Sequence, residues 1–410
     1  MRRLWSSPTI RTAGIYGAAG AGFALANLIL ARVLPTTEYA LVTLVVALVN
    51  VGFALAPAGI DGMVNRRHLE AGPRLLRITL LATTTTGTIF ALIGALGYGT
   101  SPALTSMIFV SVMVGGALMV AAAKFQSEQR YGLSLALYQS PNLVLVFAAL
   151  ITMAAGVREG WLALLIMTLG WFPGAILGWS ILFRERHEKV HRSAEFPLGE
   201  ALSYAGVQAT GLLLIQLERL ILPHVLPLRD LATYGVLAAI AGSLFRVLQM
   251  GVGYTMLPRL RAAADVRQRR RIVGKEARLV GLVVLFGSLA IWVVTPAVER
   301  WFLTGKYHLS GALVAAALVS GVAKVVNAFT KSAAAALGTG RELSFVNLMG
   351  WVSVAIGLAA ATVGSRWGLV GVIYGVALGW MVRSASTLFV AVRHLRLPVA
   401  GQSAEPAAVR

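Results

Sequence analysis

Five charged residues interrupt stretches that are otherwise strongly apolar, and they are the residues of this sequence best placed to do chemistry. They are one carboxylate and four cations, Glu218, Arg219, Arg246, Lys324 and Arg383. An ionised side chain inside an apolar helix is costly, so such residues usually line the path of an ion or a substrate. Cations gathered in one place would bind an anion, and the adjacent Glu218 and Arg219 could act as an ion-coupling pair.

Most other kinds of site are disfavoured by the composition. The chain has no cysteine, which excludes disulfides, thiolate metal ligands and thiol nucleophiles. Its six histidines are scattered without ligand spacing, so we expect no metal site. The sequence has no phosphate-binding glycine-rich loop between a strand and a helix. We therefore expect neither a cofactor nor an enzymatic activity.

The elements that carry the five charges are expected to be long apolar helices. Hydrophobic residues make up 57% of the 410 residues and charged residues only 13%, against about 25% charged residues in soluble domains. Runs of about 20 apolar residues, enough to cross a bilayer, recur along the chain. These runs predict an all-α membrane protein with about 12 transmembrane helices. The expected ranges are Thr12–Val33, Ala40–Ile60, Leu75–Gly97, Ala103–Ala123, Leu133–Ala155, Trp161–Phe183, Glu200–Leu222, Leu231–Leu257, Arg278–Pro296, Leu309–Thr330, Leu343–Gly364 and Gly368–Ala391.

The basic residues give these helices an expected orientation. The net charge is +20, and most of the 36 Lys and Arg residues fall in loops on the side of the N-terminus, with a dense run from Arg259 to Arg278. Loops on the other side hold only a few. This asymmetry is typical of the positive-inside rule, so we place the chain in the inner membrane with both termini in the cytoplasm. A basic loop of this kind contacts anionic lipid, and we expect no binding of nucleic acid.

Two sequence patterns occur once in each half of the chain. The segment Val33–Ala40 (VLPTTEYA) reappears as Val225–Ala232 (VLPLRDLA). A stripe of Gly170, Gly174 and Gly178 followed by Trp179 reappears as Gly371, Gly375 and Gly379 followed by Trp380. We predict two parallel six-helix repeats, an N-lobe of residues 1–195 and a C-lobe of residues 196–410. The glycine stripes are interpreted as faces where another helix packs closely.

Three of the cations share a predicted depth in the membrane. Arg246, Lys324 and Arg383 lie equally far along helices that run from outside to inside, on small or polar faces that are not expected to contact lipid. We predict that they line a substrate cavity, and no carboxylate is expected at their depth to pair with them. The alternative for each is a side chain that extends to the cytoplasmic interface, as Glu218 and Arg219 could extend to the opposite one. The predicted cavity residues are Arg246, Lys324, Arg383, Asn327 and Gln249.

Several segments resemble one family of membrane proteins. Residues Leu30–Ala40, then Gly59 and the Arg66-Arg67 loop, resemble the opening of polysaccharide flippases of the O-antigen and exopolysaccharide type. Glu218–Leu222 is similar to part of the seventh helix of that family, although Ala40 and Glu218 stand where the family usually has Gly and often Asp. The family belongs to the multidrug/oligosaccharidyl-lipid/polysaccharide exporter (MOP) superfamily. The resemblance implies two six-helix lobes around a central cavity that opens alternately to either side.

The resemblance and the intramembrane cations together lead to an expected function. The chain would move a polyprenyl-pyrophosphate-linked oligosaccharide across the inner membrane, with the lipid-linked substrate, membrane lipids and polysaccharide polymerase or assembly proteins as partners. One alternative is a cation-coupled multidrug exporter of the same fold, whose cavity should be acidic. Another is a membrane polysaccharide polymerase or ligase, which would need a larger outer loop than Ala297–His308.

Overall fold

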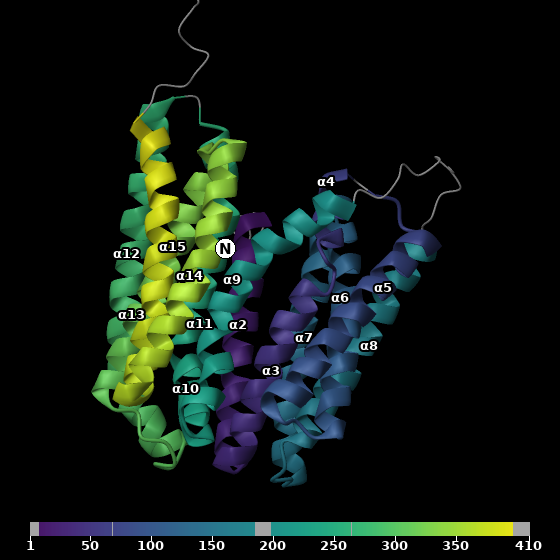
Figure 1. Ribbon diagram of the computed structural model, residues 1–410, viewed down its shortest axis with the longest axis vertical. Helices are drawn as coiled ribbons and strands as arrows, with labels where there is room; N and C mark the ends of the chain where they lie inside the picture. Colours follow the sequence, from purple (N-terminus) through teal and green to yellow (C-terminus); the bar gives the residue numbers. More distant parts are fainter. Residues whose placement is uncertain (1–7, 68, 185–197, 264, 397–410) are drawn as a thin grey trace, which may run out of the picture.

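The computed structural model describes residues 8–67, 69–184, 198–263 and 265–396, and every regular element in these ranges is a helix (Figure 1). The N-terminal half holds α2 (Pro8–Val33), α3 (Thr36–Leu55), α4 (Ile60–Arg67), α5 (Pro73–Leu92), α6 (Pro102–Ser127), α7 (Tyr131–Ala155) and α8 (Trp161–Arg184). The C-terminal half holds α9 (Leu198–Val225), α10 (Leu228–Ile240), α11 (Gly242–Arg261), α12 (Val266–Ala297), α13 (Gly311–Leu337), α14 (Gly340–Gly364) and α15 (Gly368–Arg396).

Local sequence signals explain where several helices begin. Ser101 and Ser310 precede α6 and α13, and each hydroxyl accepts a hydrogen bond from a first-turn amide. Thr339 and Glu342 form a capping box at the start of α14, in which each side chain accepts from the other residue's backbone amide. These caps satisfy amides that no helical carbonyl can reach. The caps therefore define where α6, α13 and α14 begin.

Each of the twelve predicted ranges contains a helix, but several boundaries are wrong, and three of the differences change the architecture. The second helix ends at Leu55, not Ile60, and the short helix α4 follows after a turn. The range Leu231–Leu257 is broken at Ala241 into α10 and α11, which are bent by 54°. Helix α12 begins at Val266 rather than Arg278, because the basic segment before the apolar run is itself helical and is capped by Asp265.

In the described part of the chain, eight helices are long and apolar enough to cross a membrane, or nine if the bent pair α10–α11 is one span. The longest of these stretches, Gly340–Leu395, contains both α14 and α15. These two helices pack side by side along their length (Figure 1). A Cβ atom on Gly375 would lie 2.4 Å from the backbone nitrogen of Ala361, so the glycine stripe of α15 allows close helix packing as predicted. The total of twelve spans and the two repeats remain predictions.

The two halves meet along α2 and α3 from one side and α9, α10 and α11 from the other (Figure 1). The interface is tight where the turn after α3 meets the start of α9. A Cβ atom on Gly59, whose φ is +83°, would lie 1.8 Å from the carbonyl oxygen of Ala201. Only glycine fits this backbone conformation and this approach without strain. The largest apolar core of the described residues runs continuously through both halves.

Candidate anion-binding site between the two halves

Two arginines of the C-terminal half flank one aromatic ring of the N-terminal half. The Cζ atom of Arg246 on α11 lies 5.1 Å from the ring centroid of Phe23 on α2. The Cζ atom of Arg219 on α9 lies 6.0 Å from the same centroid. Both distances fit cation–π contacts, which stabilise a guanidinium without neutralising it. We refer to Phe23, Tyr138, Arg219 and Arg246 as the arginine site.

The arginine site has an excess of positive charge. Arg219 and Arg246 are within electrostatic range of each other, and Tyr138 of α7 is within range of Arg246. Arg219 is 8% exposed, and its Nη1 donates to Oε1 of Gln216 at 3.0 Å. Its Nε has no partner among the described residues. Neither arginine forms an ion pair within the described ranges.

One carboxylate lies at the edge of this region. Asp61 on α4 accepts a hydrogen bond from Nε2 of Gln208 on α9 at 3.4 Å. The charge of Asp61 also acts electrostatically on the hydroxyl of Tyr138. The groups that act electrostatically on Arg246 are Tyr138 and Arg219, however, so Asp61 does not neutralise the pair of arginines. Two adjacent guanidinium groups without a counter-ion can bind an anionic group of a ligand, and their planar forks suit phosphate oxygens.

The structure pairs Lys324 differently from the sequence-based prediction. Nζ of Lys324 on α13 lies 2.8 Å from Oε1 of Glu218 on α9, and the hydroxyl of Ser320 donates to the same oxygen at 3.3 Å. The expectation that no carboxylate could reach Lys324 was therefore wrong. Glu218 is fully buried inside the protein. Glu218 and Arg219 form no ion pair with each other, although both act electrostatically on Tyr234 of α10.

The remaining predicted residues are not members of the arginine site, although Gln249 lies one turn after Arg246 on α11. Arg383 of α15 is 3% exposed and its guanidinium lies against Gly211 of α9. Asn327 of α13 is also 3% exposed, whereas Gln249 of α11 is partly exposed. Of the predicted cavity residues, only Arg246 lies in the arginine site, where it meets Arg219. The cations are distributed over three environments within the C-terminal half.

Several members of the site were not foreseen from the sequence. Phe23 is an apolar residue in an apolar helix, so nothing in its local pattern signals a cation–π contact. Tyr138 also lies in a long apolar stretch, although its hydroxyl and 39% exposure set it apart in the structure. Asp61, beside the site, directly follows the expected range Ala40–Ile60, and a carboxylate so close to an apolar run was a usable signal.

The end of the molecule where α2 stops is closed by contacts between the halves. Lys306, in the connection between α12 and α13, donates from Nζ to the carbonyl oxygens of Ala31, at 2.9 Å, and Leu34. The hydroxyl of Tyr307 donates to the Ala31 carbonyl at 3.2 Å, and its ring meets Tyr39 edge to face. A cation at a helix C-terminus is favourable because unpaired carbonyls collect there. Partial burial lowers the pKa of Lys306.

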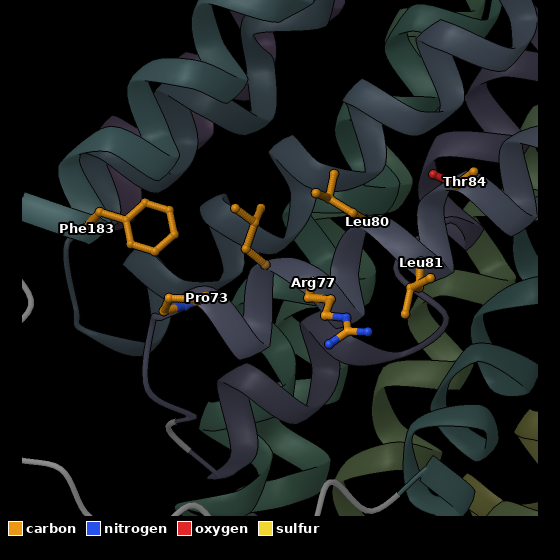
Figure 2. A pocket seen from close by; sticks show the side chains of 7 residues that line it. Pro73, Arg77, Leu80, Leu81, Thr84 and Phe183 are labelled. Carbon is orange, nitrogen blue, oxygen red and sulfur yellow. The ribbon is translucent and has the colours of Figure 1, made fainter.

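A separate pocket of about 370 Å³ lies between α5 and α8 (Figure 2). Figure 2 shows apolar side chains and Arg77 around it. All of its lining residues belong to the N-terminal half, so it is not part of the arginine site. They are Pro73, Leu76, Arg77, Leu80, Leu81, Thr84 and Phe183.

Comparison with known proteins identifies the fold. No protein-family model and no curated protein sequence matches the chain. Among solved structures, it is similar to an inward-facing multidrug-resistance MATE transporter of the MOP superfamily, with a TM-score of 0.63 and 12% identity over 92% of this chain and 94% of that one. It is equally similar to the lipid II flippase MurJ in an inward closed conformation, with a TM-score of 0.63 and 9% identity over 94% and 87% of the two chains.

A third similar structure is a mutant of the MATE transporter VcmN from Vibrio cholerae, with a TM-score of 0.56 and 14% identity over 96% of this chain and 97% of that one. The outward-facing form of the multidrug-resistance transporter matches less well than the inward-facing form, with a TM-score of 0.50. All of these proteins are transporters or flippases. This chain has the helical fold that these MATE transporters and MurJ share.

Proposed function

We propose that this chain is a flippase that moves a polyprenyl-pyrophosphate-linked oligosaccharide from the cytoplasmic to the outer leaflet of the inner membrane. The observation that supports this proposal is the pair Arg219 and Arg246, which share the Phe23 ring and have no carboxylate partner within the described ranges. A sugar–diphosphate head group cannot cross hydrocarbon unaided. Two unpaired guanidinium groups between the halves would stabilise the diphosphate while the lipid tail stays in the bilayer.

The proposed transport step needs movement but no covalent chemistry. The diphosphate would bind while the arginine site is open to the cytoplasm and leave after one half rocks against the other. The contacts of Lys306 and Tyr307 with α2 would then have to break, because they close the opposite end in this structure. Both termini would lie in the cytoplasm, and polysaccharide polymerase or assembly proteins would receive the product.

The rival function is cation-coupled export of multidrug compounds, which the MATE transporters of similar fold suggest. A carboxylate that binds a coupling cation or a cationic drug must be able to exchange its partner. Glu218 is the buried carboxylate best placed for this role, but one of its oxygens is held by Lys324 of the same chain. An internal ammonium group in this position competes with any external cation. We therefore place export of cationic drugs second.

Genetic complementation separates the two functions. A strain that lacks its own polysaccharide flippase should regain surface polymer when it expresses this chain, provided that the oligosaccharide is accepted. Arg246→Ala should abolish this export, and Arg246→Lys should retain part of it, because lysine keeps the charge but loses the planar fork. Membrane abundance must be equal to that of the unaltered chain. Resistance to ethidium without any polymer export would support the multidrug alternative.

A further inference from the structure

The pocket between α5 and α8 is a groove on the surface of the N-terminal half (Figure 2). Six of the seven residues that line it come from α5, between Pro73 and Thr84, and they recur along one face of that helix. The seventh, Phe183, comes from the last turn of α8. We call this pocket the α5–α8 groove.

Helix α6 lies behind the groove, because it packs against both α5 and α8. On the α5 side, a Cβ atom on Gly116 would lie 2.6 Å from Cγ2 of Thr83. On the α8 side, Nε1 of Trp179 donates to the carbonyl oxygen of Ala117 at 3.0 Å. The lining face of α5 is turned away from these contacts, and Leu81 on it is 61% exposed. The groove therefore opens on the outside of the helix bundle, where an apolar span faces lipid.

The length of the groove matches one leaflet of a bilayer. Figure 2 shows Phe183 beside Pro73 at one end and Thr84 at the other. The stretch of roughly 11 residues between Pro73 and Thr84 rises about 16 Å, and one leaflet contributes about 15 Å of hydrocarbon. Pro73 begins the apolar span Pro73–Gly97, and Phe183 lies next to the end of the span Trp161–Arg184. The groove therefore runs from one membrane surface towards the midplane.

Positive charge is confined to the surface end of the groove. Arg77 is the one charged side chain among the described residues that line it, and it is exposed. Arg74 and Arg184 each directly follow a lining residue at this end, and both are exposed. Glu70, an exposed carboxylate before α5, is not part of the lining. An apolar groove with a cation at one end is complementary to a molecule with an anionic head group and an acyl chain.

We infer that the α5–α8 groove binds an anionic phospholipid, with the phosphate on Arg77 and one acyl chain along the apolar face of α5. A guanidinium group forms charge-assisted hydrogen bonds with phosphate oxygens. The groove has a volume of about 370 Å³, within the range of sites that hold small ligands. The positive-inside asymmetry places its charged end at the cytoplasmic surface, where anionic head groups lie.

A lipid in this position would stabilise the N-terminal half. It would fasten α5 to α8 across the groove, and a ligand that binds the folded state raises its stability. All of the lining residues belong to the N-terminal half, so the groove is separate from the arginine site. The inference therefore does not depend on the identity of the transported substrate.

A fluorescent label beside the groove can measure which lipid occupies it. The chain has no cysteine, so Thr85→Cys gives a single labelling site at an exposed position one turn beyond Leu81. The labelled full-length protein is reconstituted in brominated phosphatidylcholine, whose bromine atoms quench the label. Unbrominated phosphatidylglycerol is then added, and the relief of quenching gives its binding constant relative to phosphatidylcholine. We expect a relative constant of about five, the effect of one basic residue on an anionic lipid.

Two groove variants of the labelled protein test the two parts of the lipid. Arg77→Gln removes the charge that would hold the head group, and Arg77→Lys keeps it. The first should lower the relative constant to about one, whereas the second should retain most of the preference. Leu80→Trp fills the apolar part of the groove and should also remove the preference. Arg278→Gln and Leu282→Trp, at exposed positions on α12, are the matched controls and should leave the constant unchanged.

A second label reports on lipid away from the groove. Leu289→Cys lies on α12 at a position that is 58% exposed, and its label should show no preference for phosphatidylglycerol. The proposal is overturned if the label at Thr85→Cys shows no preference, if either Arg77→Gln or Leu80→Trp keeps the unaltered constant, or if both labels report the same preference. Sodium phosphate, compared with sodium chloride at equal ionic strength, should not displace phosphatidylglycerol. Displacement by phosphate would assign Arg77 to a free anion and would also overturn the proposal.

Discussion

Lys324 and Glu218 form an ion pair between α13 and α9, with Nζ 2.8 Å from Oε1 and the carboxylate side chain only 1% exposed. The residues are 106 positions apart, and their two helices make few other contacts. The pair therefore links two parts of the C-terminal half that would otherwise meet only loosely.

Removing one member of this pair should destabilise the protein much more than removing both members. Glu218→Gln leaves the partly buried ammonium group of Lys324 without a counter-ion. Because removing one partner of a fully buried pair destabilises proteins by about 3–5 kcal/mol, we expect a loss at or below the lower end of this range. The double variant Glu218→Gln/Lys324→Met should recover a large part of the stability that Glu218→Gln alone loses. The double-mutant cycle compares the stability of the four proteins during thermal unfolding in detergent, with the folded fraction measured by size-exclusion chromatography. Additive effects of the two single changes would show that the side chains do not interact.

The contacts of Lys306 should hold the end of the molecule closed where α2 stops. Lys306→Met removes donors to the carbonyls of Ala31 and Leu34, and we expect the open population at this end to rise by about tenfold. Because the chain has no cysteine, Leu34→Cys gives a single labelling site at a fully buried position. Its maleimide labelling rate should rise in the Lys306→Met background. Lys275→Met, on an exposed part of α12, serves as the control, and equal rates in both backgrounds would argue against the closing role.

The close approach of α14 and α15 should make Gly375 intolerant of any larger residue. A Cβ atom there would meet the backbone of Ala360 and Ala361 at 2.4–2.6 Å, and backbone cannot move aside as a side chain can. We expect Gly375→Leu to destabilise the protein by about 1–3 kcal/mol or more. Gly281→Leu on α12 is the matched control, since nothing lies within 4 Å of its Cβ position. Folded yield measured by fluorescence-detected size exclusion should fall for the first variant alone, and comparable yields for the two would refute the packing argument.

The expected orientation can be measured with reporter fusions. Alkaline phosphatase fused after Gly305 should be active, because that position is expected on the periplasmic side, whereas a fusion after Lys275 should be inactive. Green fluorescent protein fused after either residue should give the opposite pattern. Activity after Lys275 would invert the proposed topology.

Much of the helical framework could be predicted from the sequence, for physical reasons. Apolar runs of bilayer length locate helices because a spanning helix must bury its backbone and show apolar side chains to lipid. The stripe of Gly371, Gly375 and Gly379 predicted close packing because glycine removes the side chain that keeps backbones apart. The break at Ala241 was not predicted, although the Gly242-Ser243 pair that follows it is a sequence signal for a helix kink.

The site was less predictable because depth along a helix does not fix which neighbour a side chain meets. Arg246, Lys324 and Arg383 were grouped by depth, yet Arg246 meets Phe23, Lys324 meets Glu218, and Arg383 lies against Gly211. Helix rotation, tilt and the bend between α10 and α11 decide these partners. Glu218 was considered as one member of a coupling pair with Arg219, but in the structure it is completely buried and paired with Lys324.

The central claim is that Arg219 and Arg246 bind the diphosphate of a lipid-linked oligosaccharide during its transfer across the membrane. The direct measurement reconstitutes the purified chain in liposomes with a fluorescent polyprenyl-diphosphate disaccharide and follows bleaching of the outer-leaflet probe by dithionite. With the unaltered protein, dithionite should bleach nearly all of the probe. Arg219→Gln and Arg246→Gln should each slow the transfer of the probe between leaflets by about tenfold or more. The control Arg278→Gln, an exposed arginine of α12, should flip the probe at the unaltered rate. Transfer at the unaltered rate by a folded Arg219→Gln/Arg246→Gln double variant would contradict the account.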